Sequence, residues 1–147
     1  MLPDLIRYTE VADARYIEAF INAGNSIPKA EALFSHILNS QHVWLSRING
    51  IKPEYKPWDI HPVADFKELH TKNIAEMNRV ATQEDLDKII SYSTFTGDRL
   101  ENTVRDILLH ITNHSGYHRG QVASLLKQNN VQPPVTDLIV LKREGVL

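Results

Sequence analysis

The stretch TVRDILLHITNHSGYHRGQVASLLKQ, residues 103–128, decides the fold and carries the main functional signal. Its apolar residues recur at steps of three or four positions, which is the period of an amphipathic helix. These residues are Val104, Ile107, Ile111, Val122 and Leu125. Two asparagines and then two prolines follow the stretch, and such residues commonly end helices. The pattern predicts a long helix that starts at residue 102 or 103 and ends at residue 128.

Three other stretches have the same helical period. The first covers residues 4–23 and stops before a Gly-Asn pair. The second follows the capping residue Ser26, has Pro28 in its first turn and reaches residue 49. The third is expected to be capped by Asp65 and to end before a Thr-Gln pair. The sequence therefore predicts four amphipathic helices, each with one apolar face.

Two stretches break the helical pattern. Residues 51–64 contain three prolines, which exclude regular structure and predict a long crossover. Residues 89–97, IISYSTFTG, are rich in β-branched and aromatic side chains and predict a short extended piece or hairpin. The apolar tail, residues 135–147, is expected to pack back on the helices.

Length and connectivity favour one all-α domain. A chain of 147 residues can bury enough apolar surface for a core without disulfides or metals. We expect residues 1–147 to form an antiparallel four-helix bundle, with the long crossover between the second and third helices and the extended segment before the fourth. Ligand sites of such bundles lie in the core between facing helices.

Composition excludes several functional classes. The 16 Lys and Arg residues against 18 Asp and Glu give a net charge of -2, so the basic footprint of sequence-independent nucleic-acid binding is missing. The lack of cysteine excludes a disulfide framework, a thiolate nucleophile and Cys-ligated zinc. The longest apolar run has four residues, and the first residues lack the pattern of a secretory signal. We expect a cytoplasmic protein that binds neither nucleic acid nor membrane.

Three of the seven histidines are spaced four residues apart in the last predicted long helix. His110, His114 and His118 advance by about 40° per step, so they form a ladder on one face. His114 and His118 also lie on the apolar side that points to the core. Two buried imidazoles cannot both be cationic at low cost, whereas neutral imidazoles at i and i+4 can bind one divalent ion. The sequence lacks the glutamate of H-E-x-x-H, which excludes the zincin protease mechanism.

A metal site needs at least one further ligand. The second predicted helix offers His36 and His42, and the position of His36 beside the apolar seam favours it, with His42 as the alternative. His110 lies about 12 Å from the far end of the ladder, too far to share one ion with both other rungs. We expect His110 either to support one of the metal-binding histidines without binding the ion itself, or to be a partly exposed helix residue. His61 and His70 are expected at the solvated surface.

Several residues are candidates for supporting roles. Gln121, one turn beyond the ladder, is placed to orient a ligand or substrate. His110, Tyr117 and Gln121 are candidate proton carriers or orienting groups in catalysis. A fourth side chain could complete the coordination of the ion and leave no position for water or substrate. The candidates for this fourth ligand are Asp106, Glu68, His110 and Gln121. Without a fourth side chain, a tetrahedral ion keeps a position for water or substrate.

Residues 110–121, HITNHSGYHRGQ, resemble the DinB family of damage-inducible proteins, within the wider DinB/YfiT-like group of metalloenzymes. Two further strings are similar to elements of the same family. They are LFSHILNSQHVWLSRI at residues 33–48 and PPVTDLIVLKR at residues 133–143. The resemblance therefore extends over most of the chain.

The resemblance implies a four-helix bundle, a three-histidine metal site at His36, His114 and His118, and commonly a homodimer. Some members are metal-dependent thiol S-transferases or isomerases that use low-molecular-weight thiols. We therefore expect one divalent ion, Zn²⁺ or Ni²⁺, and an enzyme that transfers such a thiol to a small-molecule electrophile. The alternatives are a metal-dependent hydrolase and a non-catalytic bundle that binds metal or a stress-related small ligand. Damage-inducible expression implies nothing about contact with DNA.

Overall fold

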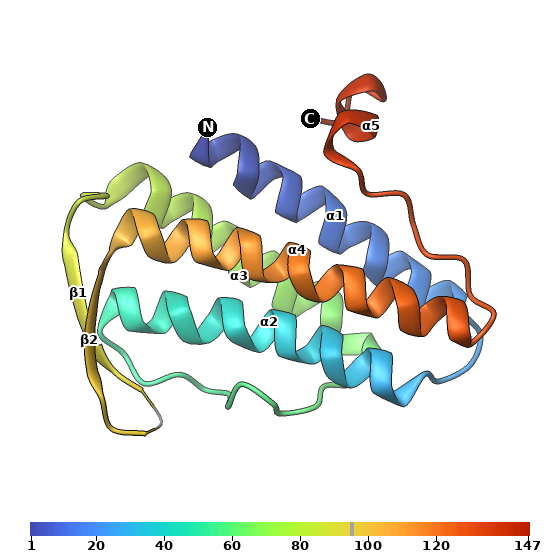
Figure 1. The fold of residues 1–147 in the computed structure, drawn as a ribbon, viewed down its shortest axis with the longest axis horizontal. Helices are drawn as coiled ribbons and strands as arrows, with labels where there is room; N and C mark the ends of the chain where they lie inside the picture. Colours follow the sequence, from blue (N-terminus) through green and yellow to red (C-terminus); the bar gives the residue numbers. More distant parts are fainter. Residues whose placement is uncertain (95) are drawn as a thin grey trace.

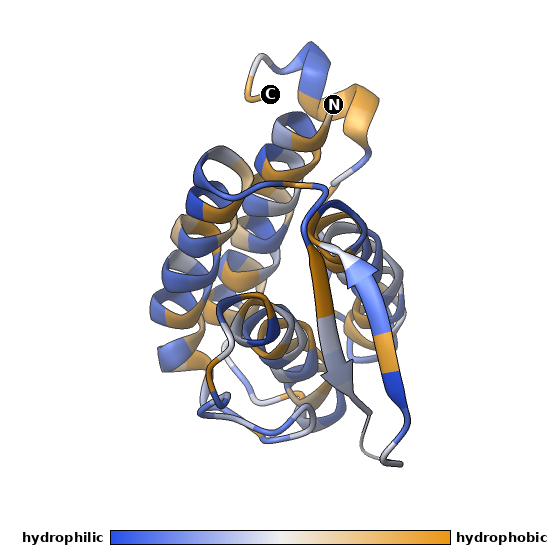
Figure 2. Cartoon of the chain, turned by 90° about the vertical axis from the view of Figure 1, so that its left-hand side faces the viewer, coloured by the Kyte–Doolittle hydropathy of each residue, from blue (hydrophilic) through white to orange (hydrophobic). Residues whose placement is uncertain are grey.

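The computed structural model describes residues 1–94 and 96–147, and these are mostly helical (Figure 1). Their elements are, in order, α1 (Leu2–Asn22), α2 (Pro28–Asn49), α3 (Val63–Gln83), β1 (Ile89–Ser93), β2 (Arg99–Thr103), α4 (Val104–Gln128) and α5 (Leu138–Arg143). The all-α prediction agrees with this organisation. Each long helix carries both apolar and polar segments, as amphipathic helices do (Figure 2). Of the described helices, none is both long and apolar enough to cross a membrane.

Two clusters of buried apolar side chains fix the directions of the four long helices. The first cluster joins the beginnings of α1 and α4 to the ends of α2 and α3. Among its members are Ile6, Leu45, Met77 and Ile107. The second cluster joins the opposite ends of the helices. Among its members are Phe20, Phe34, Phe66 and Val122. Helices α1 and α4 therefore run one way and α2 and α3 the other, which can be followed in Figure 1.

Because α2 and α3 point the same way, the chain between them must return along α2. That helix has 22 residues, which is about 33 Å at about 1.5 Å per residue. The connection can span this distance only when it is largely extended. The expected crossover therefore runs beside α2 (Figure 1). The predicted cap of α3 is wrong: Pro62 is the N-cap residue and Asp65 lies in the first turn, because the fixed φ of proline suits entry into a helix.

Of the extended segment expected at residues 89–97, Ile89–Ser93 forms β1, which pairs with β2 in an antiparallel hairpin. Residue 95 lies outside the described residues. The register sets Ile89 opposite Thr103. Thr103 then caps α4, and its side chain and that of Asp106 make the reciprocal bonds of a capping box. These bonds explain why the last long helix begins where the sequence predicts.

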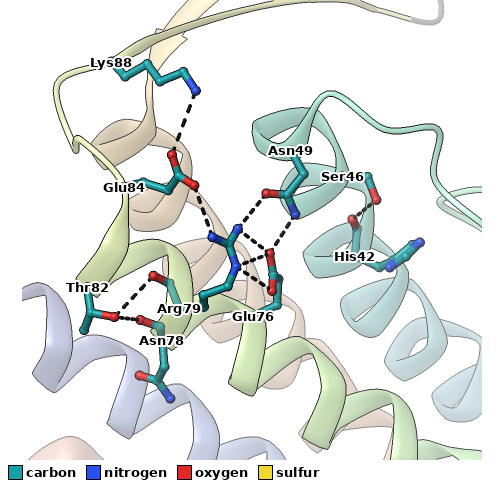
Figure 3. Close-up of polar contacts among 9 residues, drawn as sticks. All are labelled: His42, Ser46, Asn49, Glu76, Asn78, Arg79, Thr82, Glu84 and Lys88. Atoms are coloured by element: carbon teal, nitrogen blue, oxygen red, sulfur yellow. Dashed lines mark hydrogen bonds and ion pairs between the residues drawn. The ribbon is translucent and has the colours of Figure 1, made fainter.

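Arg79 connects the ends of α2 and α3 near the hairpin (Figure 3). Its guanidinium donates hydrogen bonds to Glu76, Glu84 and Asn49. Lys88, just before β1, lies 3.9 Å from the Glu84 carboxylate. These side chains are partly exposed, so their ion pairs contribute little to stability. Their main effect is to fix the point at which the chain leaves α3 for the hairpin.

The C-terminal tail packs against α1, as expected. Tyr8 donates a hydrogen bond to the Thr136 carbonyl at 3.0 Å, and Arg15 donates one to the Val135 carbonyl at 2.9 Å. The side chain of Leu141 in α5 is fully buried. Side-chain contacts with α1 thus hold the tail against the helices.

A buried polar network joins all four long helices between the two apolar clusters. Asp13 of α1 pairs with Arg119 of α4 at 2.6 Å, and their side chains are 0% and 2% exposed. Gln41 of α2 donates to the Asp13 carboxylate at 2.8 Å and to the Ser115 hydroxyl at 3.0 Å. Asn73 of α3 donates to the side-chain oxygen of Gln41 at 3.1 Å. One charge pair and its hydrogen bonds therefore connect each long helix to the others.

His70 lies beside this network, and its predicted position at the solvated surface is wrong. The side chain is only 7% exposed, because residue 70 falls on the side of α3 that also carries Phe66, Asn73 and Met77. Burial lowers the pKa of His70, and the nearby Asp13 carboxylate opposes this shift. Its Nδ1 has no hydrogen-bond partner among the residues that the structure describes.

We expect Arg119→Met to lower the free energy of unfolding by about 3–5 kcal/mol at pH 7, because it leaves the Asp13 carboxylate buried without its cation. Adding Asp13→Asn should recover part of this loss, since no buried charge then lacks its partner. Urea unfolding followed by circular dichroism measures both effects. The control is Arg7→Met, which breaks an exposed ion pair with Glu10 and should change stability by less than about 0.5 kcal/mol. Equal effects of the two single variants would contradict the prediction.

Candidate metal centre

Three histidines from two helices come together in the structure. His36 of α2 and His114 and His118 of α4 each offer one ring nitrogen, and these nitrogens all lie within 4.8 Å of one another. Nε2 of His114 and Nε2 of His118 are 3.1 Å apart. Helices α2 and α4 run side by side in opposite directions, which allows His36 to meet the middle of α4. The group could hold one metal ion.

Hydrogen bonds at the outer ring nitrogens decide which nitrogens remain free. The Pro57 carbonyl lies 2.8 Å from Nδ1 of His36, and the side-chain oxygen of Gln121 lies 2.7 Å from Nδ1 of His118. Both oxygens only accept hydrogen bonds, so each Nδ1 carries the proton and donates it. The Nε2 lone pairs of both histidines then remain available, as metal ligation requires. Gln121 thus contacts one of the candidate ligands, as its place in the sequence suggested.

The electrostatics of the group suit a shared cation. Burial, followed by the imidazoles of His118, His36 and His110, lowers the pKa of His114 to about 4. Burial also lowers the pKa of His36, and the Pro57 carbonyl opposes this shift. Both rings are therefore neutral at pH 7, the form that binds metals. Nε2 of His114 and Nε2 of His118 lie at hydrogen-bond distance, 3.1 Å apart, and a divalent ion bound to both nitrogens would replace that contact.

Within the described part of the chain, no carboxylate joins this group. The two acidic residues that were alternative ligands lie elsewhere. Glu68 is exposed and pairs with Lys72 at 2.7 Å, and Asp106 lines a separate small cavity with Trp44 and Tyr92. With three protein ligands, a tetrahedral ion would keep one position for water or substrate.

His110 and Tyr117 flank the group without joining it. The ring of His110 lies 5.4 Å from that of His114 and 5.0 Å from that of Trp44, so it continues the ladder toward the hairpin. Tyr117 is exposed, and its ring lies 5.0 Å from that of His118. Both residues and His114 line one groove between α1 and α4, with a volume of about 670 Å³.

The structure separates the two histidines of α2. Nε2 of His42 accepts a hydrogen bond from the Glu54 amide at 3.0 Å, so His42 contacts the crossover while His36 faces α4. The predicted position of His61 at the solvated surface is wrong. Its side chain is partly buried and donates to the Asn39 side-chain oxygen at 2.6 Å, because the crossover lies against α2.

The sequence did not indicate that two crossover residues contact the group. Pro57 supplies the carbonyl that accepts from His36, and the Trp58 ring stacks on the His36 ring with centroids 3.7 Å apart. The prolines of this segment predicted only an irregular connection. The order KPWD at residues 56–59 predicts a turn. Such a local pattern does not show that the turn contacts His36, about 20 residues earlier in the sequence.

These features define the class: a mostly helical protein with a candidate three-histidine metal centre between two antiparallel helices. The chain belongs to the DinB family, whose family model matches residues 13–144. It is 24% identical over 123 residues to Protein DinB of Bacillus subtilis (strain 168), an alignment that covers 75% of this chain and 70% of that protein. The family match confirms the resemblance found in the sequence, and all three histidines lie within it.

We expect His118→Ala to weaken zinc binding by more than about 100-fold, because it removes one of the three converging nitrogens. Competition with a chromophoric chelator measures the affinity, and elemental analysis measures the bound metal. His42→Ala is the matched control, because it removes a histidine of α2 that contacts the crossover instead of the group. This variant should bind zinc as tightly as the protein without substitutions. If His42→Ala lost zinc while His36→Ala kept it, the group identified here would not be the metal site.

Proposed function

We propose that this DinB-family protein is a four-helix-bundle metalloenzyme that transfers a low-molecular-weight thiol to a small electrophile. The convergence of three imidazoles, without a fourth protein ligand among the described residues, carries the proposal. A bound divalent ion such as Zn²⁺ or Ni²⁺ would supply the positive charge that lowers the pKa of a thiol or of water. The chain has no cysteine, which favours a thiol that arrives as a substrate.

The residues around the group have distinct proposed tasks. His36, His114 and His118 hold the ion. Gln121 keeps the ring of His118 in place through the proton on its Nδ1. Tyr117 borders both His118 and the groove, so it is the side chain best placed to exchange a proton with a substrate there. His110 is the second candidate for that task.

The groove between α1 and α4 supports a small-molecule substrate. Its volume of about 670 Å³ lies within the usual range for small-molecule sites. Leu5, Tyr8 and Leu109 supply much of its apolar wall, and His114 borders it. The described lining contains no Asp, Glu, Lys or Arg, so the groove suits an uncharged, largely apolar electrophile.

We expect the visible absorption of the cobalt-substituted protein to change when a low-molecular-weight thiol is added, because sulfur would enter the coordination sphere of the ion. His118→Ala, treated in the same way, is the control and should show no such change. Thiol transfer to a small electrophile is then assayed with metal-loaded and metal-stripped protein. An unchanged spectrum with several thiols would contradict thiol transfer and favour hydrolysis by metal-activated water. A spectral change without turnover would favour a metal-binding protein that is not an enzyme.

We also propose that two copies of the chain form a homodimer, as the family resemblance implies. Isologous packing of one helical face is the commonest closed arrangement of identical chains. Sedimentation at micromolar concentration should therefore give twice the mass of the 16.8 kDa chain. A single species of 16.8 kDa would contradict the prediction.

A further inference from the structure

A tight turn in the crossover brings Trp58 to the metal centre. The amide of Asp59 donates to the Lys56 carbonyl at 3.2 Å, and the Asp59 carboxylate accepts from the Lys56 amide at 2.8 Å. Pro57 occupies the second position of this β-turn, which its fixed φ favours. The four residues KPWD therefore form the turn from local interactions.

His36 is held by this turn on two sides. The Pro57 carbonyl accepts its Nδ1 proton at 2.8 Å. The indole of Trp58 lies flat on the imidazole, with centroids 3.7 Å apart and planes 6° from parallel. The hydrogen bond fixes one point of the His36 ring, and the stack fixes its plane. Together they set the direction in which Nε2 points.

Hydrogen bonds to α2 keep the turn in position. Asn39 donates to the Asp59 carbonyl at 2.7 Å, and the amide of His61 donates to the Ser35 hydroxyl at 3.1 Å. Trp58 itself is 64% exposed, so burial in a core does not explain its position. His36 beneath it is only 7% exposed. The indole therefore serves as a cover over one face of a candidate metal ligand.

We propose that Trp58 is a positioning residue of the metal centre, which orients His36 and raises the affinity of the site for its ion. This inference rests on the proposed metal-dependent function. An imidazole that binds a cation through Nε2 loses electron density, while the face of an indole is electron-rich. The stack is therefore stronger when the ion is bound than when it is absent. An interaction that favours the bound state increases affinity.

The affinity test uses Trp58→Ala and Trp58→Phe, with Ile60→Ala as the matched control. Ile60 lies in the same segment and is 70% exposed. Zinc affinity, measured by chelator competition, should fall by about 10-fold in Trp58→Ala, since residues that support metal ligands have effects of this size. Trp58→Phe keeps an aromatic face and should recover most of the affinity, while Ile60→Ala should bind zinc normally.

Fluorescence gives a second readout that does not depend on activity. Trp44 and Trp58 are the two tryptophans of the chain, and Trp44 packs against Tyr92 and His110 instead. In Trp44→Phe, the emission of Trp58 should change as zinc is added and should stop changing at one equivalent. In Trp58→Phe, that change should be lost.

The outcomes separate this inference from the proposed function. If the unchanged protein binds zinc and Trp58→Ala binds it as tightly as Ile60→Ala, the inference is wrong and the metal centre stands. If Trp58→Ala loses affinity only together with thermal stability, and phenylalanine restores neither, the role is structural and the inference is also wrong. If the unchanged protein binds no divalent ion, the proposed function and the inference both fail.

Discussion

The buried ion pair between Asp13 and Arg119 is the constraint on which the rest of the structure depends. Removing two charges from water is costly, and their attraction offsets that cost only at hydrogen-bonding distance. Gln41 and Asn73 extend the pair to the two remaining long helices. Apolar side chains tolerate small shifts between helices, whereas this network does not. It therefore fixes the register of all four long helices.

The same network positions the three histidines of the candidate metal centre. Ser115 and Arg119 each follow a histidine of the group directly in the sequence, so their hydrogen bonds set the rotation of α4 about its axis. The hydrogen bonds of Gln41 likewise set the rotation of α2 about its axis, about one and a half turns beyond His36. The three imidazoles therefore converge through contacts within the protein. A site that is already ordered needs less ordering when an ion binds, which favours affinity.

Periodicity in the sequence was sufficient for the helices and for part of the site. The spacing of His114 and His118 predicted their convergence, because a helix alone determines their relative geometry. Periodicity could not predict the burial of Asp13 and His70, because the contacts of both side chains involve other helices. The expected antiparallel bundle with a crossover did not specify that α2 and α3 point the same way, because an amphipathic pattern is the same in both directions along a helix. The stack of Trp58 on His36 depends on those directions.

The directions of α2 and α3 connect the topology to the chemistry of the site. Two successive antiparallel helices need only a short loop, and no chain would then run along α2. The parallel pair requires a long extended crossover, and that segment supplies the Pro57 carbonyl, which places the proton of His36 on Nδ1. Helix α4 thus positions the candidate ligands His114 and His118, while the crossover between α2 and α3 orients the third, His36. The orientation of His36 therefore depends on the length and turn of the crossover, whereas the spacing of the other two ligands depends on α4 alone.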